Sequence, residues 1–495
     1  MFFTSTRSNC NIESAFAIAK GLADDGGLFV PESFPAFSQE DIDRMIGMDY
    51  KGRAVEVLSK YLTDFTCEEI TACVNAAYTG KFDNEEPAPL VEVAPGVNLL
   101  ELWHGPTCAF KDMALQLLPH LLTASVAKTS KGRTTVILVA TSGDTGKAAL
   151  DGFADVDGTK IIVFYPQNGV SAMQKLQMTT QEGGNVAVCA INGNFDNAQT
   201  GVKNIFSDKA MAEKLDAVAM DFSSANSINF GRLVPQIVYY VSSYCELLKS
   251  GRLERGKEFN VVVPTGNFGN ILAAVYAKKM GIPIKKFICA SNRNNILTDF
   301  INTGVYDRNR DFYTTTSPSM DILISSNLER LLYLLFDRNC GEISNLMAQL
   351  KNDGKYTIPA DKHAALQSEF NGNCASDEEA SAAIKDLFER YNYLCDTHTA
   401  VAVSVYNKYL AETKDDTCCV IASTASPYKF STAVLEAVTG SKAQDDEFAV
   451  VSQLSKVTGT KVPAPLAGLA DKKVLHTSCV EKEDMAKFIE NFLNI

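Results

Sequence analysis

Short, almost uninterrupted apolar runs alternate with helix-like stretches through much of the chain. The runs are rich in β-branched residues and most are followed by apolar residues at helical spacing. They occupy residues 134–141, 160–166, 185–191, 260–264, 285–291 and 418–424. Apolar strands that alternate with helices are typical of parallel sheets covered on both faces. The pattern therefore predicts an α/β fold with two doubly wound parallel-sheet domains.

The flanking regions differ from this pattern. Residues 1–94 show helical spacing with Gly- and Pro-rich breaks, which predicts a mostly helical N-terminal region. We expect a large domain from residues 95–130 and 225–495 and a small, mobile α/β domain from residues 131–224. Residues 353–382 are polar and irregular, which predicts surface loops and short helices. Residues 483–495 predict an amphipathic closing helix.

Composition excludes several classes of protein. The 495 residues carry a net charge of −13 without a cluster of Lys and Arg, so we expect no nucleic-acid partner. The 13 cysteines include no C-x-x-C pair, which argues against a zinc site or a secreted disulfide framework. The first residues lack a signal-peptide pattern, and no apolar run reaches about 18 residues. We expect a cytoplasmic protein with no metal and no membrane span.

The turn TGNFGN at residues 265–270 stands between a predicted strand and a predicted helix. Gly266 and Gly269 are expected to take positive φ angles, so that backbone N–H groups converge on an anion. The partial positive charge of the helix N-terminus, typically about 0.3–1 kcal/mol, would add to this attraction. The turn predicts a phosphate cradle. The alternative is a plain strand-to-helix turn.

A second turn, SGDTG at residues 142–146, precedes Lys147. A nucleotide-binding P-loop needs a glycine five places before the Gly-Lys pair and Ser or Thr after it, but Thr141 and Ala148 stand there. What remains is a turn rich in hydroxyl and N–H groups, suited to a carboxylate or a phenolate. The alternative is a helix cap supplied by Ser142 or Asp144.

Lys111 lies in the stretch LWHGPTCAFKDMALQL at residues 102–117. Apolar surroundings disfavour the ammonium form of a lysine and leave its amine as a nucleophile, which a Schiff base requires. The alternative is a solvated surface lysine. No G-x-G-x-x-G follows a strand, which argues against a dinucleotide-dependent oxidoreductase.

The three elements together resemble the fold type II pyridoxal-phosphate enzymes, the group that includes tryptophan synthase β. HGPTCAFKD matches the lysine-bearing segment, and SGDTG and GNFGN follow in the expected order. More closely, the chain resembles the long form of the threonine synthase family. This resemblance extends from about residue 25 to residue 430, through the stretches DGGLFVP, ELWHGPTCAFKD, ATSGDTG, NSINFGRL, VPTGNFGN, SPSMDILISSNLERL, DTHTAVA and ASTASPYKF.

The resemblance implies a role for each matching residue. Lys111 would hold pyridoxal 5′-phosphate as a Schiff base and carry protons, and Thr145 would assist catalysis. Thr424 would hydrogen-bond the pyridine nitrogen of the cofactor, and Asp144 would lie at its O3′ edge. The cofactor phosphate would be held by Gly266, Asn267, Phe268, Gly269 and Asn270.

The resemblance also implies the substrate contacts. Ser142, Gly143 and Thr145 would hold the substrate carboxylate. The substrate phosphate would be bound by Asn226, Ser227, Arg232 and Lys429, because Arg offers a planar fork and Lys a point charge to phosphate oxygens. The alternative for Arg232 is a surface ion pair.

Four positions depart from the family pattern. Asn270 replaces the usual Asp, which removes one negative charge near the cofactor phosphate. The segment Ser426–Phe430 reads SPYKF where HPAKF is usual, so the lost histidine and the bulkier Tyr428 could reshape the cofactor or substrate pocket. Thr397 replaces a proline. Beside it, His398 is the histidine expected nearest the site, with a purely structural role as the alternative.

The activity implied is conversion of O-phosphohomoserine and water to threonine and phosphate, by a monomer or homodimer. One alternative is a phospholyase that releases 2-oxobutyrate, ammonia and phosphate from the same substrate. An alternative of a different class is a catalytically silent metabolite-binding protein. Lys111 argues against this last one.

Overall fold

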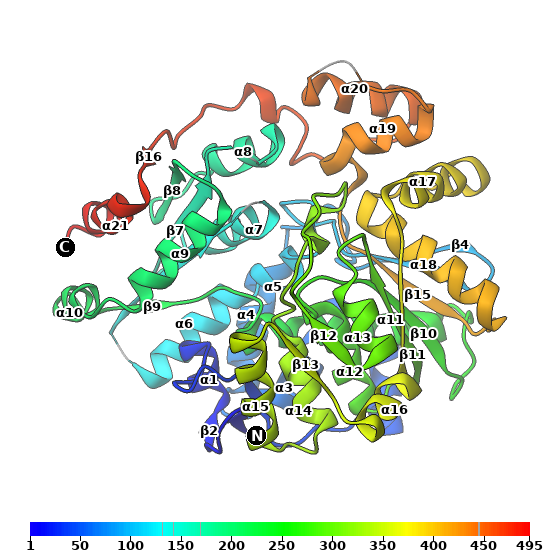
Figure 1. Cartoon of the computed structure of the whole chain (residues 1–495), viewed down its shortest axis with the longest axis horizontal. Helices are drawn as coiled ribbons and strands as arrows, with labels where there is room; N and C mark the ends of the chain where they lie inside the picture. Colours follow the sequence, from blue (N-terminus) through cyan, green and yellow to red (C-terminus); the bar gives the residue numbers. More distant parts are fainter. Residues whose placement is uncertain (131, 142, 169, 444–445) are drawn as a thin grey trace.

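The computed structural model describes all residues except 131, 142, 169 and 444–445. Two large β-sheets form the centres of two parts of the chain. In Figure 1 the smaller sheet, with β7 and β8, lies on the left, and the larger sheet, with β10, β11 and β15, lies on the right. Helices cover both. The predicted α/β fold with two parallel-sheet units is confirmed.

The larger sheet has six strands in the order β14-β11-β10-β15-β5-β4, parallel except for the β4–β5 pair. Alternate side chains of β10 face opposite sides, so that Val261 and Val263 join one core cluster and Val262 joins the other. The strands are β4 (Leu90–Ala94), β5 (Val97–Glu101), β10 (Phe259–Pro264), β11 (Ile284–Ser291), β14 (Phe370–Cys374) and β15 (Cys419–Ser423).

Helices pack on both faces of the larger sheet, and α11 and α12 lie on the opposite side from α18 and α19. The helices of this part are α5 (Asp112–Leu115), α6 (Leu118–Thr129), α11 (Phe230–Lys249), α12 (Gly269–Lys279), α13 (Ile296–Thr303), α14 (Leu328–Leu335), α15 (Cys340–Asn352), α16 (Ala360–Glu369), α17 (Asp377–Tyr391), α18 (Thr397–Thr413), α19 (Ser431–Thr439) and α20 (Glu447–Thr458). A hairpin, β12 (Val305–Asp307) and β13 (Lys355–Thr357), and the short 3₁₀ turns η1 (Pro318–Met320), η2 (Pro427–Phe430) and η3 (Leu469–Asp471) complete it.

Two edge strands differ from the sequence prediction. The residues of β4 were expected to belong to the helical N-terminal region. They form a strand that pairs with β5 through a tight turn, in which Gly96 has a φ of 75°. β14 lies within residues 353–382, which were expected to form loops and short helices. Its sequence FNGNC has few apolar residues because it is an edge strand, and its Gly372 lies against α13, where a Cβ would lie 3.0 Å from Ile301.

The smaller sheet is parallel throughout, in the order β16-β8-β7-β6-β9. Its strands are β6 (Thr134–Ala140), β7 (Thr159–Pro166), β8 (Val186–Ile191), β9 (Met220–Ser223) and β16 (Cys479–Val480). Its helices are α7 (Asp144–Phe153), α8 (Ala172–Thr179), α9 (Phe195–Phe206), α10 (Lys209–Ala217) and α21 (Met485–Leu493), with the 3₁₀ turn η4 (Lys482–Asp484).

The C-terminal segment belongs with the smaller sheet, which corrects the predicted division that assigned residues 225–495 to the large domain. β16 pairs with β8. The closing helix was predicted correctly as α21, and its Met485 and Ile489 join the core that contains Ile162 and Phe164. The apolar face of this helix therefore packs on the small sheet.

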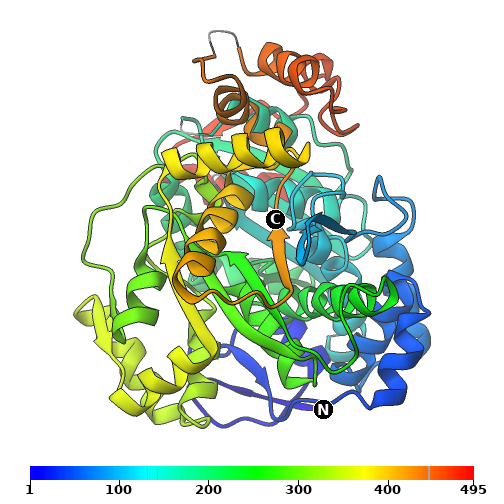
Figure 2. The ribbon, with the colours of Figure 1, turned by 90° about the vertical axis from the view of Figure 1, so that its right-hand side faces the viewer.

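The N-terminal region contains four helices and a small antiparallel sheet that was not predicted. The helices are α1 (Ser14–Lys20), α2 (Gln39–Ile46), α3 (Tyr50–Tyr61) and α4 (Cys67–Tyr78), and the strands β1 (Phe2–Ser5), β2 (Ile12–Glu13) and β3 (Phe29–Pro31) run in the order β2-β1-β3. Figure 2 shows this region in blue along the lower side. No helix in the described ranges is both long and apolar enough to cross a membrane.

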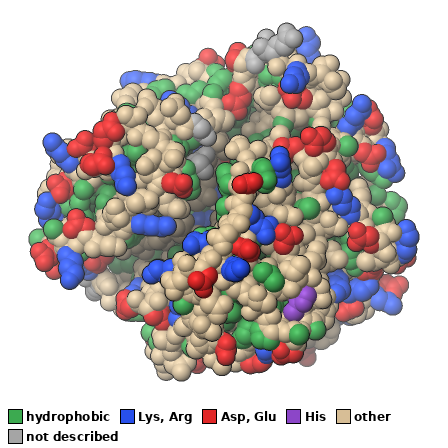
Figure 3. Space-filling view, viewed as in Figure 1, with side chains coloured by type: hydrophobic (Ala, Val, Ile, Leu, Met, Phe, Trp, Pro, Cys, Tyr) green, Lys and Arg blue, Asp and Glu red, His purple; other side chains and the backbone are tan. Residues whose placement is uncertain are grey.

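The two sheet-bearing parts meet closely on one side and leave a hollow on another. Gly152 of α7 packs so tightly on the backbone of Leu115 in α5 that a Cβ at this position would overlap it. Figure 3 shows the surface hollowed between the left-hand lobe and the rest of the molecule. In open parallel sheets such a crevice, at the carboxyl ends of the strands, is the usual place for a ligand.

Candidate active site

Lys111 lies immediately before α5, where the chain returns beside the end of β15. Ala109 and Ala425 form a β-bridge, and the Phe110 N–H donates to the Thr424 carbonyl over 2.8 Å. The Lys111 side chain is only 11% exposed. Its Nζ lies 3.3 Å from Ser319 Oγ and 3.7 Å from Asp144 Oδ2. Lys111 is therefore a shielded amine at the junction of the two domains, which excludes the solvated alternative.

A compact loop fixes the direction of Lys111. The buried Asp112 carboxylate accepts hydrogen bonds from the Thr107 N–H at 2.8 Å and the Thr107 hydroxyl at 2.6 Å. Burial raises the pKa of Asp112 to about 7. A Cβ on Gly105 would lie 2.5 Å from the Asp112 side chain, so the loop requires glycine there. The HGPTCAFKD motif thus closes on itself and presents Lys111 to the crevice.

Asp144 joins two lysines across the domain junction. Its carboxylate lies 2.7 Å from Lys429 Nζ on one oxygen and faces Lys111 with the other. Gln174 Nε2 also donates to Asp144 over 3.1 Å. Although burial opposes ionisation, the two lysines hold the pKa of Asp144 well below its usual range. Asp144 is therefore a fixed negative charge beside the Lys111 amine.

We expect Lys111 of the cofactor-free protein to react with aldehydes at lower pH than surface lysines do. Burial lowers the pKa of the Lys111 ammonium; Asp144 opposes this shift, and Lys429 and Arg232 add to it. Asp144→Asn should lower the pKa of Lys111 further, because it removes the opposing charge. Reductive methylation followed by mass spectrometry would measure the pH profile at Lys111, with surface lysines in the same digest as references. Identical profiles would contradict the expectation.

The GNFGN turn connects β10 to α12, as predicted, but by a different backbone route. Neither Gly266 nor Gly269 takes a positive φ; Phe268 does, at 64°. The expectation of positive φ at these glycines is therefore wrong. Gly266 is required for another reason: a Cβ there would lie 2.6 Å from the Ser319 carbonyl oxygen. Close approach of a second loop explains this glycine.

Hydrogen bonds from a neighbouring loop to its carbonyl groups hold the GNFGN turn in place, and one buried donor of the turn is left without a partner. Ser325 Oγ donates to the Gly266 carbonyl at 2.7 Å, and the Asn327 N–H donates to the Asn267 carbonyl at 3.1 Å. Asn270 Oδ1 accepts a hydrogen bond from the Tyr240 hydroxyl. Asn270 Nδ2 is buried without a hydrogen-bond partner among the described residues. A buried, unpartnered donor at a helix N-terminus is suited to an anion.

The residues expected to bind the substrate phosphate differ in their burial and in their hydrogen-bond partners. Arg232 is 4% exposed and forms no ion pair with the described residues, which excludes the surface alternative. Its Nη1 donates to the Ala225 carbonyl, its Nε is unpartnered, and burial lowers its pKa to about 10. Ser227 Oγ accepts from Asn327 Nδ2 at 3.3 Å, which links it to the GNFGN turn. Asn226 is exposed.

Lys429 is fully engaged within the protein. Besides Asp144, it donates to the Thr107 carbonyl at 2.9 Å and to Gln177 Oε1 at 3.3 Å. These three acceptors match the three hydrogens of an ammonium group. In this arrangement the side chain joins the Lys111 loop to the small domain.

The SGDTG turn was predicted as a site element, but Ser142 lies outside the described residues. Thr141 Oγ1 organises the turn by accepting from the Gly143 and Gly146 N–H groups, at 3.0 and 3.1 Å. Thr145 is half-buried in the first turn of α7. Thr424 is 5% exposed at the end of β15. The two predicted turns and the end of β15 therefore lie around Lys111.

Several residues at the site were not nominated from the sequence. Ser319 contacts Lys111, and Asp396 contacts His398, the histidine that was expected near the site and that accepts the Ser319 N–H. Gln174 and Gln177 of α8 reach Asp144 and Lys429. Among the described residues, no group of His, Cys, Asp and Glu is arranged to hold a metal ion.

Comparison with known proteins assigns the family. The family model described as threonine synthase N terminus matches residues 2–78, and the model described as pyridoxal-phosphate dependent enzyme matches residues 83–424. The model described as threonine synthase, C-terminal, matches residues 399–489. The threonine synthase of Schizosaccharomyces pombe is 36% identical over 87% of this chain and 88% of its own length. The chain belongs to the threonine synthase family.

Other members of the threonine synthase family agree in sequence and structure. The Pseudomonas aeruginosa threonine synthase is 38% identical over 89% of this chain and 91% of its own length. A crystal structure of PLP-bound threonine synthase from Brucella melitensis has a TM-score of 0.89 and 34% identity, covering 99% of both chains. The threonine synthase-like 1 protein of Macaca fascicularis is 41% identical over 85% of this chain. This match covers only 57% of that protein's own length.

Proposed function

We propose that this chain is a threonine synthase that converts O-phospho-L-homoserine and water into L-threonine and phosphate. The observation that carries the proposal is the shielded Lys111 amine, held between the N-termini of α7 and α12 beside the fixed charge of Asp144. The family models and the relatives named threonine synthase support it over nearly the whole chain.

The residues present fit pyridoxal phosphate. Lys111 would hold the cofactor covalently, because its shielded amine has a lowered pKa. The cofactor phosphate would lie in the turn from Gly266 to Asn270, where the unpartnered Asn270 Nδ2 supplies a donor. An asparagine at this position donates where an aspartate could not, so the departure from the family pattern favours anion binding. Thr424 would face the ring nitrogen, and Asp144 would lie at the O3′ edge.

Once bound, pyridoxal phosphate supplies an electron sink that acidifies protons of the amino-acid substrate. Lys111 would take up and return those protons, because its lowered pKa suits a general base. In the overall reaction Cγ loses phosphate and gains a proton, while Cβ exchanges a proton for a hydroxyl from water. Thr145 and the SGDTG turn, with Ser142 and Gly143, would hold the substrate carboxylate.

Arg232 and Ser227 are proposed to bind the substrate phosphate, with Asn226 at the rim. Arg232 is buried close enough to Lys111 to lower its pKa, and its Nε is unpartnered. A phosphate in contact with this guanidinium would receive a charge-assisted hydrogen bond. Lys429 would bind the substrate phosphate together with Arg232 only by exchanging one of its present hydrogen-bond acceptors for a phosphate oxygen.

The phospholyase alternative receives less support from the structure than from the sequence. Tyr428 was one of the two departures in the segment Ser426–Phe430, with the histidine lost at Ser426, that suggested a reshaped pocket. Its side chain is 2% exposed, and its hydroxyl bonds the Thr460 carbonyl at 2.8 Å and hydroxyl at 2.7 Å. Tyr428 thus anchors the segment after α20 within the core of the large domain.

We expect purified protein, incubated with pyridoxal phosphate and O-phosphohomoserine, to release threonine and phosphate in equal amounts. Amino-acid chromatography, a phosphate assay and a 2-oxo-acid assay on one reaction would separate the candidates. Phosphate accompanied by 2-oxobutyrate and ammonia would favour the phospholyase. If no phosphate is released although the cofactor binds, the silent binding protein would replace the proposal.

We also propose a cytoplasmic location and a monomeric or homodimeric state. All thirteen cysteines are unpaired, which suits a reducing compartment. Fractionation with an antibody would test the location, and light scattering would test the assembly.

A further inference from the structure

The 3₁₀ turn η1 touches both halves of the candidate cofactor site through one residue. Ser319 Oγ accepts the hydrogen bond from Lys111 Nζ at 3.3 Å. The Ser319 carbonyl lies against Gly266, leaving no room there for a Cβ. One residue thus sets both the position of the reactive amine and the approach to the phosphate turn.

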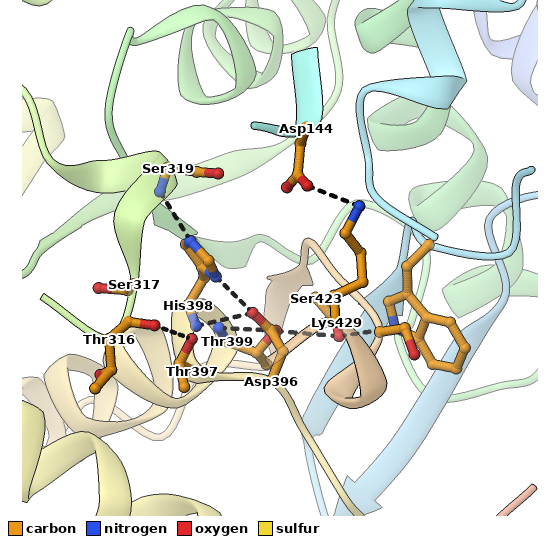
Figure 4. A network of polar contacts seen from close by, with 12 residues as sticks. Asp144, Thr316, Ser317, Ser319, Asp396, Thr397, His398, Thr399, Ser423 and Lys429 are labelled. Atoms are coloured by element: carbon orange, nitrogen blue, oxygen red, sulfur yellow. Dashed lines mark hydrogen bonds and ion pairs between the residues drawn. The ribbon is translucent and has the colours of Figure 1, made fainter. Parts of the chain in front are cut away.

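Behind the turn, His398 and Asp396 hold Ser319 in place (Figure 4). His398 Nδ1 lies 2.7 Å from Asp396 Oδ2, an acceptor, so this nitrogen carries the hydrogen. His398 Nε2 therefore has a free lone pair, and it accepts the Ser319 N–H at 3.1 Å. Both side chains are nearly inaccessible, at 3% and 0% exposure. The pair therefore presents one defined acceptor, His398 Nε2, to one backbone N–H.

The N-terminus of α18 fastens the same loop at a second point. Thr397 Oγ1 donates to the Thr316 carbonyl at 2.7 Å. Asp396 also accepts from the His398 and Thr399 N–H groups, so it caps α18 while it orients the histidine. The turn is consequently fixed to the end of a 17-residue helix.

We propose that Ser319 is the residue that directs the Lys111 amine towards the cofactor, and that His398 and Asp396 are positioning residues that act through it. The described hydrogen-bond and ion-pair partners of Lys111 Nζ are Ser319 and Asp144, beside a ring contact with Phe110 at 4.9 Å, and Asp144 is already bound by Lys429 at 2.7 Å. Without the Ser319 hydroxyl, the amine would be drawn to the carboxylate and away from the phosphate turn. The inference rests on the proposed function, because Lys111 must be the cofactor-bearing lysine.

Ser319→Ala is expected to weaken pyridoxal phosphate binding about ten- to a hundred-fold, the range for losing a hydrogen bond to a charged group. Absorbance titration of the cofactor-free protein would measure the dissociation constant, and borohydride trapping would measure the fraction of Lys111 modified. Ser319→Thr keeps the hydroxyl and should restore most of both. Thermal unfolding of each cofactor-free variant checks that the fold is unchanged. Equal cofactor affinity in the Ala and unmodified proteins would overturn the role of Ser319.

A double-mutant cycle tests whether His398 acts through Ser319. His398→Leu should weaken cofactor binding, and His398→Gln should weaken it less, because Gln Oε1 can still accept the Ser319 N–H. In the Ser319→Ala background, His398→Leu should add less loss than it causes alone, since the hydroxyl it positions is gone and only the backbone contact with Gly266 remains to be disturbed. If the loss of cofactor affinity in the double variant equals the product of the fold-losses in the two single variants, His398 acts independently of Ser319 and the positioning role is wrong.

The same experiments separate this inference from the proposed function. Borohydride labelling of the unmodified protein at a lysine other than Lys111 would overturn the proposed cofactor attachment and the inference together. If borohydride labels Lys111, and Ser319→Ala has the cofactor affinity and the labelled fraction of the unmodified protein, the inference alone would be overturned. Products other than threonine would overturn the proposed activity and leave the Ser319 contact standing.

Discussion

Replacement of Lys111 by alanine is expected to remove covalent attachment of pyridoxal phosphate and to lower turnover of O-phosphohomoserine by roughly 10²–10⁴-fold or more. The reason is that one shielded amine would both bind the cofactor and transfer the protons, and Lys429, which shares Asp144 with Lys111, already has three acceptors. Loss of the Schiff-base absorbance band and loss of borohydride labelling would report attachment, and threonine release would report turnover.

Lys147 offers a matched control for this substitution. It lies three residues after Asp144 in the same helix, but its ammonium pairs with Asp151 at 3.2 Å, away from Lys111. Lys147→Ala should keep the absorbance band and the labelled lysine. If Lys111→Ala retained the band while Lys147→Ala lost it, the cofactor lysine would be misassigned.

Gly266→Ala is expected to cost about 1–3 kcal/mol of stability and to weaken cofactor binding strongly. The added Cβ would lie 2.6 Å from the Ser319 carbonyl oxygen, a backbone atom of a turn that His398 holds in place. Relief of that overlap requires the phosphate turn and η1 to separate, as in other overpacked sites. Urea unfolding of the cofactor-free protein gives the stability change, and absorbance titration gives the affinity.

Gly269, in the same turn, is the matched control for stability. A Cβ there would meet Asn327 at 3.5 Å and Gln236 at 3.6 Å, which are ordinary contacts. Gly269→Ala should therefore leave the unfolding free energy of the cofactor-free protein unchanged, or raise it by about 0.4–1 kcal/mol through reduced chain entropy. Equal destabilisation by the two alanines would show that the overlap with Ser319 does not decide the cost.

The sequence was sufficient to predict six strands of the two sheets and the two turns near Lys111, because both depend on local patterns. Six apolar runs became β6, β7, β8, β10, β11 and β15. The edge strands β14 and β16 escaped prediction because an edge strand needs little apolar surface. The left-handed residue of the phosphate turn was also missed: tertiary packing places Phe268, with its 1% exposed side chain, in a conformation for which glycine is the sequence signal.

Contacts between distant segments could not be predicted from local patterns. Ser319 meets His398 across 79 residues, and Lys429 meets Gln177 across 252. Their stretches, SPSMDILISSNLERL and DTHTAVA, were part of the family resemblance, but nothing in them indicates which side chains touch. Lys429 illustrates the limit: a lysine near a phosphate site suggests an anion ligand, whereas the fold also gives it a carboxylate, a carbonyl and an amide as partners.

The late return of β16 to β8 imposes an order on folding during synthesis. Until residues 479–480 leave the ribosome, the outer edge of β8 has unpaired backbone groups, and Ile162 and Phe164 lack the cover of α21. Exposed strand edges are sites of self-association. The small sheet is thus completed only after the large domain has been made, and the nascent chain would need its β8 edge shielded, by a chaperone or by rapid release, until then.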